Sequence, residues 1–382
     1  YPPQDWGGAT HVVRDNVNEL CKNYRDDFDI EILTTEFGGL RDLEFKYDSD
    51  IVNNIRVWRI TTPPQEMGDS TVYDERNLEN FDKIINITKP DIVHLHCIQR
   101  ITTSIIDVIM KRNIPYIITA HDGWWISPNQ FIVNDLGVEE YYNYNDYLDQ
   151  SDRCKTLKPY LQNAACITTV SESFKKIHID CGINNIVNVE NGMVKNSHEV
   201  KKVIHNKKVM LTHMGGSEFH KGLSIVKNVL KKSNFKNLEF SYIDYSQSEG
   251  LINKETWGST KVYKYGRFNQ GKVFDFLADK NILIVPSRWP ESYGLVVREG
   301  LLSGCRVITS NKGALFQDIK EGENGFIFDL ENAEESLFNI LDFINNNYKT
   351  FLKPLEKPYI ARSIKKQVEE FVEIYKKILF KN

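Results

Sequence analysis

The strongest chemical signal in the sequence is a pair of glutamates beside a run of small and polar residues. Glu291 and Glu299 follow an apolar strand pattern and lie eight residues apart, just over two turns of helix. A helix that begins at Glu291 would carry both carboxylates on much the same face. Residues 292–295 would then lie at its N-terminus, where free backbone N–H groups and the helix dipole favour an anion. The spacing predicts a site with two acceptor carboxylates and an anion cradle.

An ordinary structural explanation of the same block stays open. Glutamates are common in the first turn of a helix because they interact favourably with its dipole. In that case Glu291 only stabilises the helix start, and Glu299 is a buried carboxylate paired with an arginine such as Arg298.

A second candidate site follows the first strand pattern of the C-terminal half, in the segment HMGGSEFHKGL. Gly215 and Gly216 allow the backbone to approach a ligand closely, and Lys221 offers a compact positive charge for a phosphate. The spacing is not that of a Walker P-loop or of a dinucleotide-binding turn. The alternative is a tight strand-to-helix turn with a surface lysine.

The N-terminal half offers histidine, tryptophan and glycine residues. His121 follows a buried strand pattern and would stand at the carboxyl edge of a sheet, where α/β proteins bind ligands. Trp124 and Trp125 predict either an aromatic platform for an acceptor or core packing. Gly7 and Gly8 predict either a loop that lets an acceptor approach or a flexible turn before a helix.

Two further patterns of this half carry weaker hypotheses. His94 and His96 alternate with apolar residues, which is typical of histidines inside a sheet. The acidic pairs in DFD (27–29) and DSD (48–50) would suit Mg²⁺ or Mn²⁺ in a metal-dependent enzyme. Both pairs lie in acidic stretches, where a solvated turn is the ordinary explanation. We therefore predict no metal site.

These residues need a scaffold, and one pattern repeats along the whole chain. Short β-branched or aromatic runs alternate with helical segments, and near-continuous apolar runs such as IVHL and YIITA predict strands buried on both faces of a parallel sheet. The pattern predicts an α/β protein with two doubly wound, Rossmann-like domains. The predicted strands are Asp29–Thr35, Ile55–Ile60, Asp91–His96, Tyr116–His121, Cys166–Ser171, Ile186–Glu190, Val209–Met214, Leu238–Tyr245, Lys261–Tyr265, Ile282–Ser287, Arg306–Thr309 and Gly325–Phe328.

The domain boundary is predicted in the polar stretch between Asn191 and His205. We expect an N-terminal domain of residues 1–195, a C-terminal domain of 196–360 and a final helix of 361–382 that packs back across the domains. The segment 134–152 is acidic and rich in tyrosine, which predicts a functional loop or a surface excursion with short helices.

Composition and charge exclude several classes of protein. With 41% hydrophobic and 26% charged residues, the chain has an ordinary globular composition. No apolar run is long enough to span a bilayer, and six scattered cysteines favour a reduced, cytoplasmic protein.

The net charge differs between the two halves of the chain. Residues 1–195 carry a net charge of −11 and the remainder +7, so the C-terminal half is the better candidate for an anionic ligand. The basic residues are too dispersed for nucleic-acid binding.

Several motifs occur together: YPP and GGA near the start, TAHDG at 119–123, VSES at 170–173, ENGM at 190–193, the GG…HKG turn, and PES-Y-G-L-V-x-x-E-G-L. This combination resembles the retaining glycosyltransferases of family 4 over nearly the whole chain. The resemblance implies the GT-B architecture, in which two Rossmann-like domains face a cleft. The donor would bind the C-terminal domain and the acceptor the N-terminal one. In the family YPP follows a first β-strand, so we expect that about ten N-terminal residues are missing here.

The resemblance also implies a role for each candidate residue. In the family the second glutamate of the block holds the nucleotide ribose, the first contacts the donor sugar, and the lysine binds the diphosphate. A histidine of the N-terminal domain faces the transferred sugar. The implied catalytic residues are thus His121, Glu291 and Lys221. The implied donor-binding residues are Gly215, Gly216, Lys221, Arg267, Glu291, Ser292, Tyr293, Gly294, Leu295, Val296 and Glu299, and the acceptor-side residues are Gly7, Gly8, Trp124 and Trp125.

The chain departs from the family pattern at the diphosphate. Family members commonly carry an arginine five or six residues before the lysine, where this chain has Gly215 and Gly216. The candidates to replace it are the backbone N–H groups of these glycines and the side chains of His220, Arg267 and Arg288. In addition, Val194 stands where the family has aspartate, and SNKGALFQDI lacks the usual G-G-x-P turn.

We therefore expect a retaining glycosyltransferase that moves a hexose from a UDP- or GDP-linked donor to a hydroxyl of a saccharide or lipid-linked acceptor. The product would be a surface polysaccharide or glycoconjugate precursor. No metal and no cofactor are expected, because Lys221, a helix N-terminus and nearby arginines can stabilise the departing diphosphate. The expected location is the cytoplasm, with contact with the inner face of the membrane left open. The alternatives are a GT-B-like nucleotide-sugar epimerase and a non-catalytic, two-lobed sugar-nucleotide binding protein.

Overall fold

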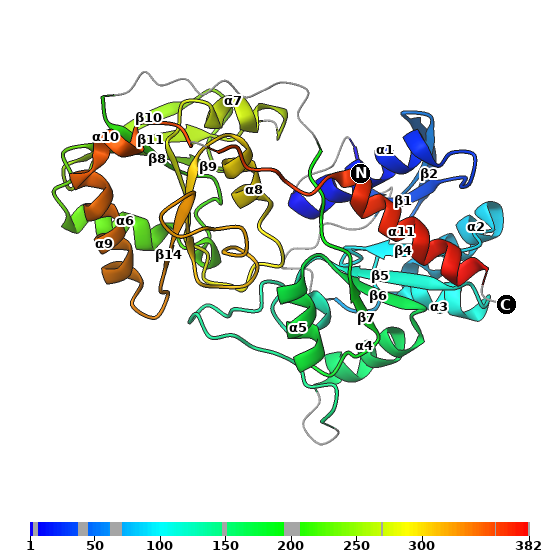
Figure 1. Ribbon diagram of the computed structural model, residues 1–382. Coiled ribbons are helices and arrows are strands. Elements are labelled where there is room, and N and C mark those ends of the chain that lie inside the picture. Colours follow the sequence, from blue (N-terminus) through cyan, green and yellow to red (C-terminus); the bar gives the residue numbers. More distant parts are fainter. Residues whose placement is uncertain are drawn as a thin grey trace. The chain divides into compact units, whose positions relative to one another are not determined.

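The computed structural model describes residues 1–2, 7–36, 45–61, 71–146, 151–194, 207–268, 270–355 and 357–380 (Figure 1). The chain divides into two compact units. Unit 1 consists of Tyr1–Ile132, Glu140–Val194 and Arg362–Asn382, and unit 2 of Val133–Glu139 and Lys195–Ala361. The prediction of an uninterrupted N-terminal domain is wrong in one respect, because Val133–Glu139 clusters with unit 2. The predicted junction at 195–196 lies outside the described residues.

The described residues of unit 1 form two sheets. In the first, β1 (Glu31–Glu36) pairs in parallel with β3 (Ile55–Thr61), and β3 pairs antiparallel with β2 (Tyr47–Val52). The second is a parallel ladder of β4 (Val93–His96), β5 (Tyr116–Ala120), β6 (Cys166–Thr169) and β7 (Ile186–Asn188). Every residue of β5 is buried, as its apolar run predicts.

The helices of unit 1 connect these strands and cover them. They are α1 (Gly8–Asn23), α2 (Leu78–Thr88), α3 (Ser104–Lys111), α4 (Asp152–Asn163), α5 (Glu172–Asp180) and α11 (Ile364–Leu379). The last helix, α11, begins at the Ser363 cap, whose side chain accepts from the backbone N–H of Lys366. Its apolar face packs against α1, where Val368 and Val372 meet Leu20.

In unit 2 the residues that the structure describes form one seven-stranded sheet, ordered β10-β11-β9-β8-β12-β13-β14. The strands are β8 (Val209–His213), β9 (Leu238–Asp244), β10 (Ile252–Trp257), β11 (Thr260–Gly266), β12 (Ile282–Val285), β13 (Arg306–Ser310) and β14 (Gly325–Phe328). Only the pairing of the edge strand β10 with β11 is antiparallel among the described pairs of this sheet.

Alternate residues of β12 join two different core clusters of unit 2. Ile282 and Ile284 pack in the cluster that includes helices α6 (Leu223–Lys232) and α9 (Ala333–Asn346). Leu283 and Val285 pack in the cluster that includes α7 (Val273–Leu277) and α8 (Leu295–Leu302). A short helix, α10 (Tyr348–Phe351), follows α9. The central strands are therefore covered on both faces, which is the predicted doubly wound arrangement. In the described part of the chain, none of the helices has the length and apolar character that crossing a bilayer requires.

Candidate functional site

The chain order of the strands in unit 2 reverses at β8. Strand β9 pairs with β8 on one side, and β12 pairs with it on the other. Ligands of open α/β sheets bind beyond the carboxyl ends of the strands at such a point. The loop that follows β8 carries Lys221 and the loop that follows β12 carries Glu291. The fold thus brings together the two segments that sequence analysis selected separately.

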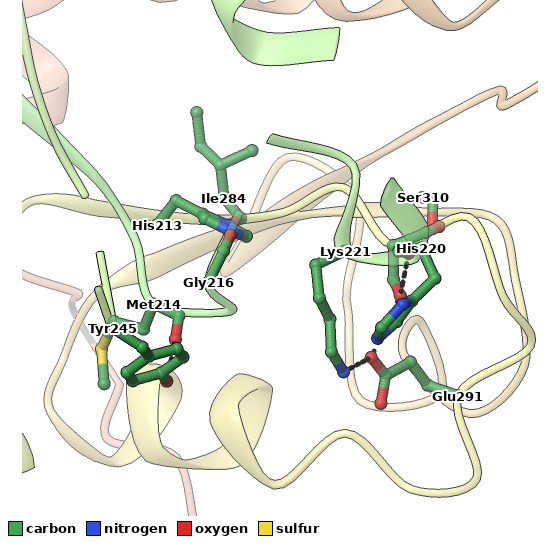
Figure 2. A network of polar contacts seen from close by, with 10 residues as sticks. His213, Met214, Gly216, His220, Lys221, Tyr245, Ile284, Glu291 and Ser310 are labelled. Carbon is green, nitrogen blue, oxygen red and sulfur yellow. Dashed lines mark hydrogen bonds and ion pairs between the residues drawn. The ribbon is translucent and has the colours of Figure 1, made fainter. Parts of the chain in front are cut away.

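Lys221 and Glu291 form an ion pair between these loops (Figure 2). Lys221 Nζ lies 2.8 Å from Glu291 Oε1, and Ser287 Oγ donates to the same oxygen at 3.0 Å. Burial acts to raise the pKa of the Glu291 carboxyl, but the Lys221 charge and the hydrogen bonds lower it below its usual value. The carboxylate is therefore ionised at neutral pH and neutralises the charge of Lys221.

The helix of the glutamate block begins later than the sequence predicts. Gly294 has a φ of 77° and caps α8, so the helix starts at Leu295. Glu291 lies in the preceding turn, where its backbone N–H donates to Trp289 O at 2.8 Å. Glu299 is buried within α8. The prediction that both glutamates lie on one helix face is therefore wrong, because a left-handed glycine separates the turn from the helix.

Arg298 anchors this turn from inside the domain. Its guanidinium lies 4.3 Å from the ring centroid of Tyr293 and donates to the backbone oxygens of Tyr293 and Ala314. Arg298 Nε lies 2.7 Å from Asp318 Oδ2, and the arginine side chain is fully buried. The partner of Arg298 is thus an aspartate on a later loop, and not the buried glutamate that the structural alternative assumed.

His213 contacts the backbone of the glycine turn after β8. His213 is buried, with Nδ1 3.0 Å from Ile284 O of β12 and Nε2 2.9 Å from Gly216 O. Gly216 has a φ of 84°, a conformation that favours glycine. The Tyr245 hydroxyl donates to Met214 O at 2.9 Å on the same turn (Figure 2). These contacts hold the backbone of residues 214–216 in one conformation.

The remaining predicted donor residues differ in burial and in position along the sheet. Ser292, Tyr293 and Gly294 are buried, Leu295 and Val296 are half-buried, Gly215 lies in the turn after β8, and Arg267 is exposed after β11. The Arg288 guanidinium lies 4.6 Å from the Phe219 ring centroid and donates to Ser224 Oγ at 3.3 Å. Burial and the Lys221 charge lower the pKa of His220 to about 4, so this imidazole is neutral at pH 7. The roles of these residues in donor binding stay predictions.

Unit 1 carries its own polar cluster at the carboxyl end of β4 and β5. His121 follows β5, and its Nε2 lies 2.9 Å from Nδ1 of His96, the last residue of β4. Burial lowers the pKa of His121 to about 4, so the ring is neutral at pH 7. His94 contacts the Thr119 hydroxyl at 2.6 Å and the Tyr375 hydroxyl of α11 at 2.7 Å. His94 therefore lies inside the sheet, as the alternation of histidines with apolar residues predicts. His96 instead contacts the His121 ring.

Trp124 and Trp125 belong to the core of unit 1. Trp124 and Trp125 are buried and meet edge to face, with ring centroids 4.8 Å apart. The Arg153 guanidinium covers Trp124 at 4.6 Å from the ring centroid. This burial favours core packing over an acceptor platform. Gly7 and Gly8 are exposed at the start of α1, where Gly7 has a φ of 102°.

The acidic pairs of unit 1 are engaged in structural contacts. Asp27 pairs with Lys376 at 2.9 Å, and Asp50 with Arg59 at 3.0 Å. Over the described ranges, His, Cys, Asp and Glu side chains form no group of three or more that could hold a metal ion.

Sequence reasoning missed three residues of these clusters, His213, Ser287 and Ser310, and interpreted His96 only as a histidine inside the sheet. Ser287 and Ser310 are linked through the Ser287 backbone oxygen, which accepts from Ser310 Oγ at 2.6 Å. The only available signal was a polar residue at the end of each buried strand. Their partners lie up to 71 residues away along the chain, so no local pattern identifies them.

Comparison with known proteins agrees with this architecture. The family model described as "Glycosyltransferase Family 4" matches residues 6–194, and that described as "Glycosyl transferases group 1" matches residues 194–366. Among curated proteins, a 41.2 kDa protein in the cps region of Klebsiella pneumoniae is 28% identical over 225 residues, which are 55% of this chain and 61% of that protein. An uncharacterized glycosyltransferase of Methanocaldococcus jannaschii is 22% identical over 87% of this chain and 91% of that protein.

Solved structures share the fold at low sequence identity. Sucrose-phosphate synthase from Thermosynechococcus elongatus has a TM-score of 0.66 at 15% identity, covering 97% of this chain and 94% of that chain. Anabaena HepE, solved in complex with UDP-glucose, has a TM-score of 0.61 at 16% identity, covering 98% and 95% respectively.

Proposed function

The chain belongs to the glycosyltransferases with the GT-B fold, and from this premise we propose that it transfers a hexose from a nucleotide sugar to a hydroxyl acceptor with retention of the anomeric configuration. The observation that carries the proposal is the Lys221–Glu291 pair at the point where the strand order reverses. A cation and a carboxylate placed there suit a ligand with both a diphosphate and sugar hydroxyls. The likeness to HepE, which was solved with UDP-glucose, supports a donor of this class.

The transfer needs a stabilised leaving group. As the bond between the anomeric carbon and the phosphate oxygen breaks, negative charge develops on the diphosphate, and Lys221 lies where it can compensate that charge. The start of α8 adds the positive end of a helix dipole. The acceptor oxygen then bonds to the anomeric carbon on the same face, and its proton passes to the departing phosphate oxygen.

A front-side displacement of this kind fits the residues around His121. A covalent double displacement would need a free carboxylate as nucleophile. Asp122, the next residue, accepts hydrogen bonds from the side chains of Gln99 and Gln130 and from the backbone N–H of Trp124. Its oxygens are thus committed to holding the 122–130 loop. We propose that His121 contacts the transferred sugar as a neutral hydrogen-bonding group.

The acceptor is proposed to be a saccharide or a lipid-linked saccharide. A Klebsiella relative is named for the cps region, which supports a polysaccharide precursor as the product. The test is transfer from UDP-glucose, UDP-galactose and GDP-mannose to a panel of alkyl glycosides, with the product anomer assigned by NMR. An inverted product would refute retention. Conversion of the donor without acceptor would favour the epimerase, and donor binding without turnover would favour the non-catalytic binder.

Transfer is also proposed to require no metal, because Lys221 and the start of α8 would supply positive charge to the diphosphate. Activity should persist in excess EDTA. Complete loss that Mg²⁺ or Mn²⁺ restores would place the chain among metal-dependent enzymes instead.

A further inference from the structure

His213 makes two contacts that a neutral imidazole cannot satisfy together. Its Nδ1 lies 3.0 Å from Ile284 O, and its Nε2 lies 2.9 Å from Gly216 O. Carbonyl oxygens only accept, so each contact needs an N–H on the ring. A neutral imidazole carries one N–H and the imidazolium carries two. Only the doubly protonated ring therefore donates to both strand β12 and the glycine turn.

The ring lies directly behind the turn that leads to Lys221. A Cβ atom on Gly215 would lie 2.8 Å from the His213 ring and 3.5 Å from Lys221 Cβ. The backbone of Gly215 is therefore close to both side chains. Gly216, whose oxygen His213 contacts, occupies a position where the family resemblance expects arginine. A positive charge on His213 would therefore lie close to the position at which the arginine is missing.

The surroundings of His213 decide when it is charged. Burial lowers its pKa below the usual value, the Lys221 charge acts in the same direction, and the Glu218 carboxylate and the two carbonyl contacts oppose them. Strand β9 contributes the phenol of Tyr242, paired with His213 in register, and the nearby turn is contacted by the phenol of Tyr245. Both phenols are neutral at pH 7, because an ordinary phenol has a pKa of about 10 and burial raises both pKa values further. At pH 7 the ring is therefore neutral and donates to only one of the two carbonyl oxygens.

We propose that His213 takes up a proton when the donor diphosphate binds, so that an imidazolium behind the Gly215–Gly216 turn supplies the charge of the absent arginine. The inference rests on the proposed function. The bound anion offsets the cost of a buried cation, and both carbonyl contacts become hydrogen bonds. His213 acts through the turn and is a positioning residue.

Proton uptake makes donor affinity depend on pH. Between the pKa of the free ring and that of the bound ring, the complex holds one proton more than the free protein. Affinity must then fall by up to about tenfold for each unit of rising pH. Carboxylates near the site do not produce this slope above pH 7, because they are ionised in both states.

The experiment is calorimetry of donor binding at pH 7.5 in two buffers with different ionisation enthalpies. The probes are UDP-glucose, GDP-mannose and ADP-glucose, whose doubly esterified diphosphates do not titrate near neutral pH. The wild-type protein should take up at least about half a proton per bound donor. His213→Gln keeps one donor group but cannot become charged, so its binding should release or take up no protons and should lose the pH slope. The matched control, His220→Gln, should keep the uptake.

Several outcomes would overturn the inference. Donor binding without proton uptake in the wild-type protein would refute this inference but not the proposed function. Proton uptake that persists in His213→Gln, or that disappears in His220→Gln, would also refute this inference. If His213→Gln does not fold, ¹⁵N NMR of histidine-labelled wild-type protein replaces it, and both ring nitrogens of His213 must show imidazolium shifts in the complex. Failure of all three donors to bind would refute the proposed function and this inference together.

Discussion

The Lys221–Glu291 pair should contribute measurably to the stability of unit 2, and a double-mutant cycle can isolate its contribution. The perturbation is Lys221→Met, Glu291→Gln and the double variant, with the free energy of unfolding measured in urea at pH 7. Both single variants keep the approximate size of the side chain and remove one charge. Lys221→Met leaves the Ser287 hydroxyl to donate to Glu291, so the cycle reports mainly the ion pair.

The structure sets the expected magnitude. Opposite unit charges at 2.8 Å attract by about 6 kcal/mol in a medium of effective dielectric constant 20. The lysine and glutamate side chains are 25% and 12% exposed, so screening, desolvation and side-chain entropy offset much of this attraction. We expect a coupling free energy of about 2 kcal/mol, between the values typical of exposed pairs and of fully buried ones.

A second ion pair of the same domain provides a matched control. Lys232 and Glu334 approach to 2.6 Å, but their side chains are 72% and 41% exposed. Their coupling should stay below about 1 kcal/mol. Equal coupling in the two pairs, or a Lys221–Glu291 coupling below about 0.5 kcal/mol, would refute the argument that burial strengthens the pair at the site.

The coupling should also depend on pH in a defined direction. The folded-state pKa of Glu291 is below its usual value, so the stabilisation is fully present above the unfolded-state pKa of about 4.3. It should be lost as the pH falls through the folded-state pKa. The same cycle repeated from pH 7 to pH 3 should therefore show a constant coupling above pH 5 and a declining one below about pH 4. A coupling that persists undiminished to pH 3 would contradict this assignment of the charges.

The remaining predictions concern ligand binding, turnover and the buried arginine. His121→Ala should lower turnover while nucleoside diphosphate still binds; a collapse of diphosphate affinity in the folded variant would show that the residue is misplaced. Glu299→Gln should weaken the binding of nucleoside diphosphate and of nucleotide sugar alike, by about 1.5–3 kcal/mol in calorimetry. Glu291→Gln should change diphosphate affinity by less than about tenfold and reduce the rate of transfer much more. Arg298→Met should destabilise the protein by about 3–5 kcal/mol in urea unfolding, because it leaves the Asp318 carboxylate without its buried partner; a loss below about 1 kcal/mol would mean that the pair is not needed to hold the turn.

The sequence predicted the parallel strands well because their signal is local. Runs such as YIITA and ILIV must be buried on both faces, and they form β5 and β12 with every residue buried. The two described strands that were missed, β2 and β10, are antiparallel edge strands, with three and five exposed residues of six respectively. Their sequences, YDSDIV and INKETW, carry charged and polar residues, so no apolar run distinguishes them from a loop.

The glutamate block shows the limit of periodicity. The eight-residue spacing of Glu291 and Glu299 fits a helix, and the composition of the intervening residues does not contradict one. The conformation of Gly294 at the cap decides where α8 begins. Gly313 packs closely against the turn that holds Glu291. A Cβ atom on Gly313 would lie 2.5 Å from the backbone of Glu291. This contact joins loops that are remote in the chain, so the spacing alone cannot reveal it.

By itself, the sequence determined the class of fold, the positions of the buried parallel strands along the chain, the family and the two segments that the fold brings together after β8 and β12. These properties follow from apolar patterning and from motifs that are short and contiguous. Only the tertiary structure decided which side chains meet: Lys221 with Glu291, His96 with His121, and His213 with both Ile284 and the glycine turn. The physical reason is that strand order in a sheet is a long-range property. Burial of the whole sheet selects β8 and β12 as neighbours, and their carboxyl ends then bring distant loops together.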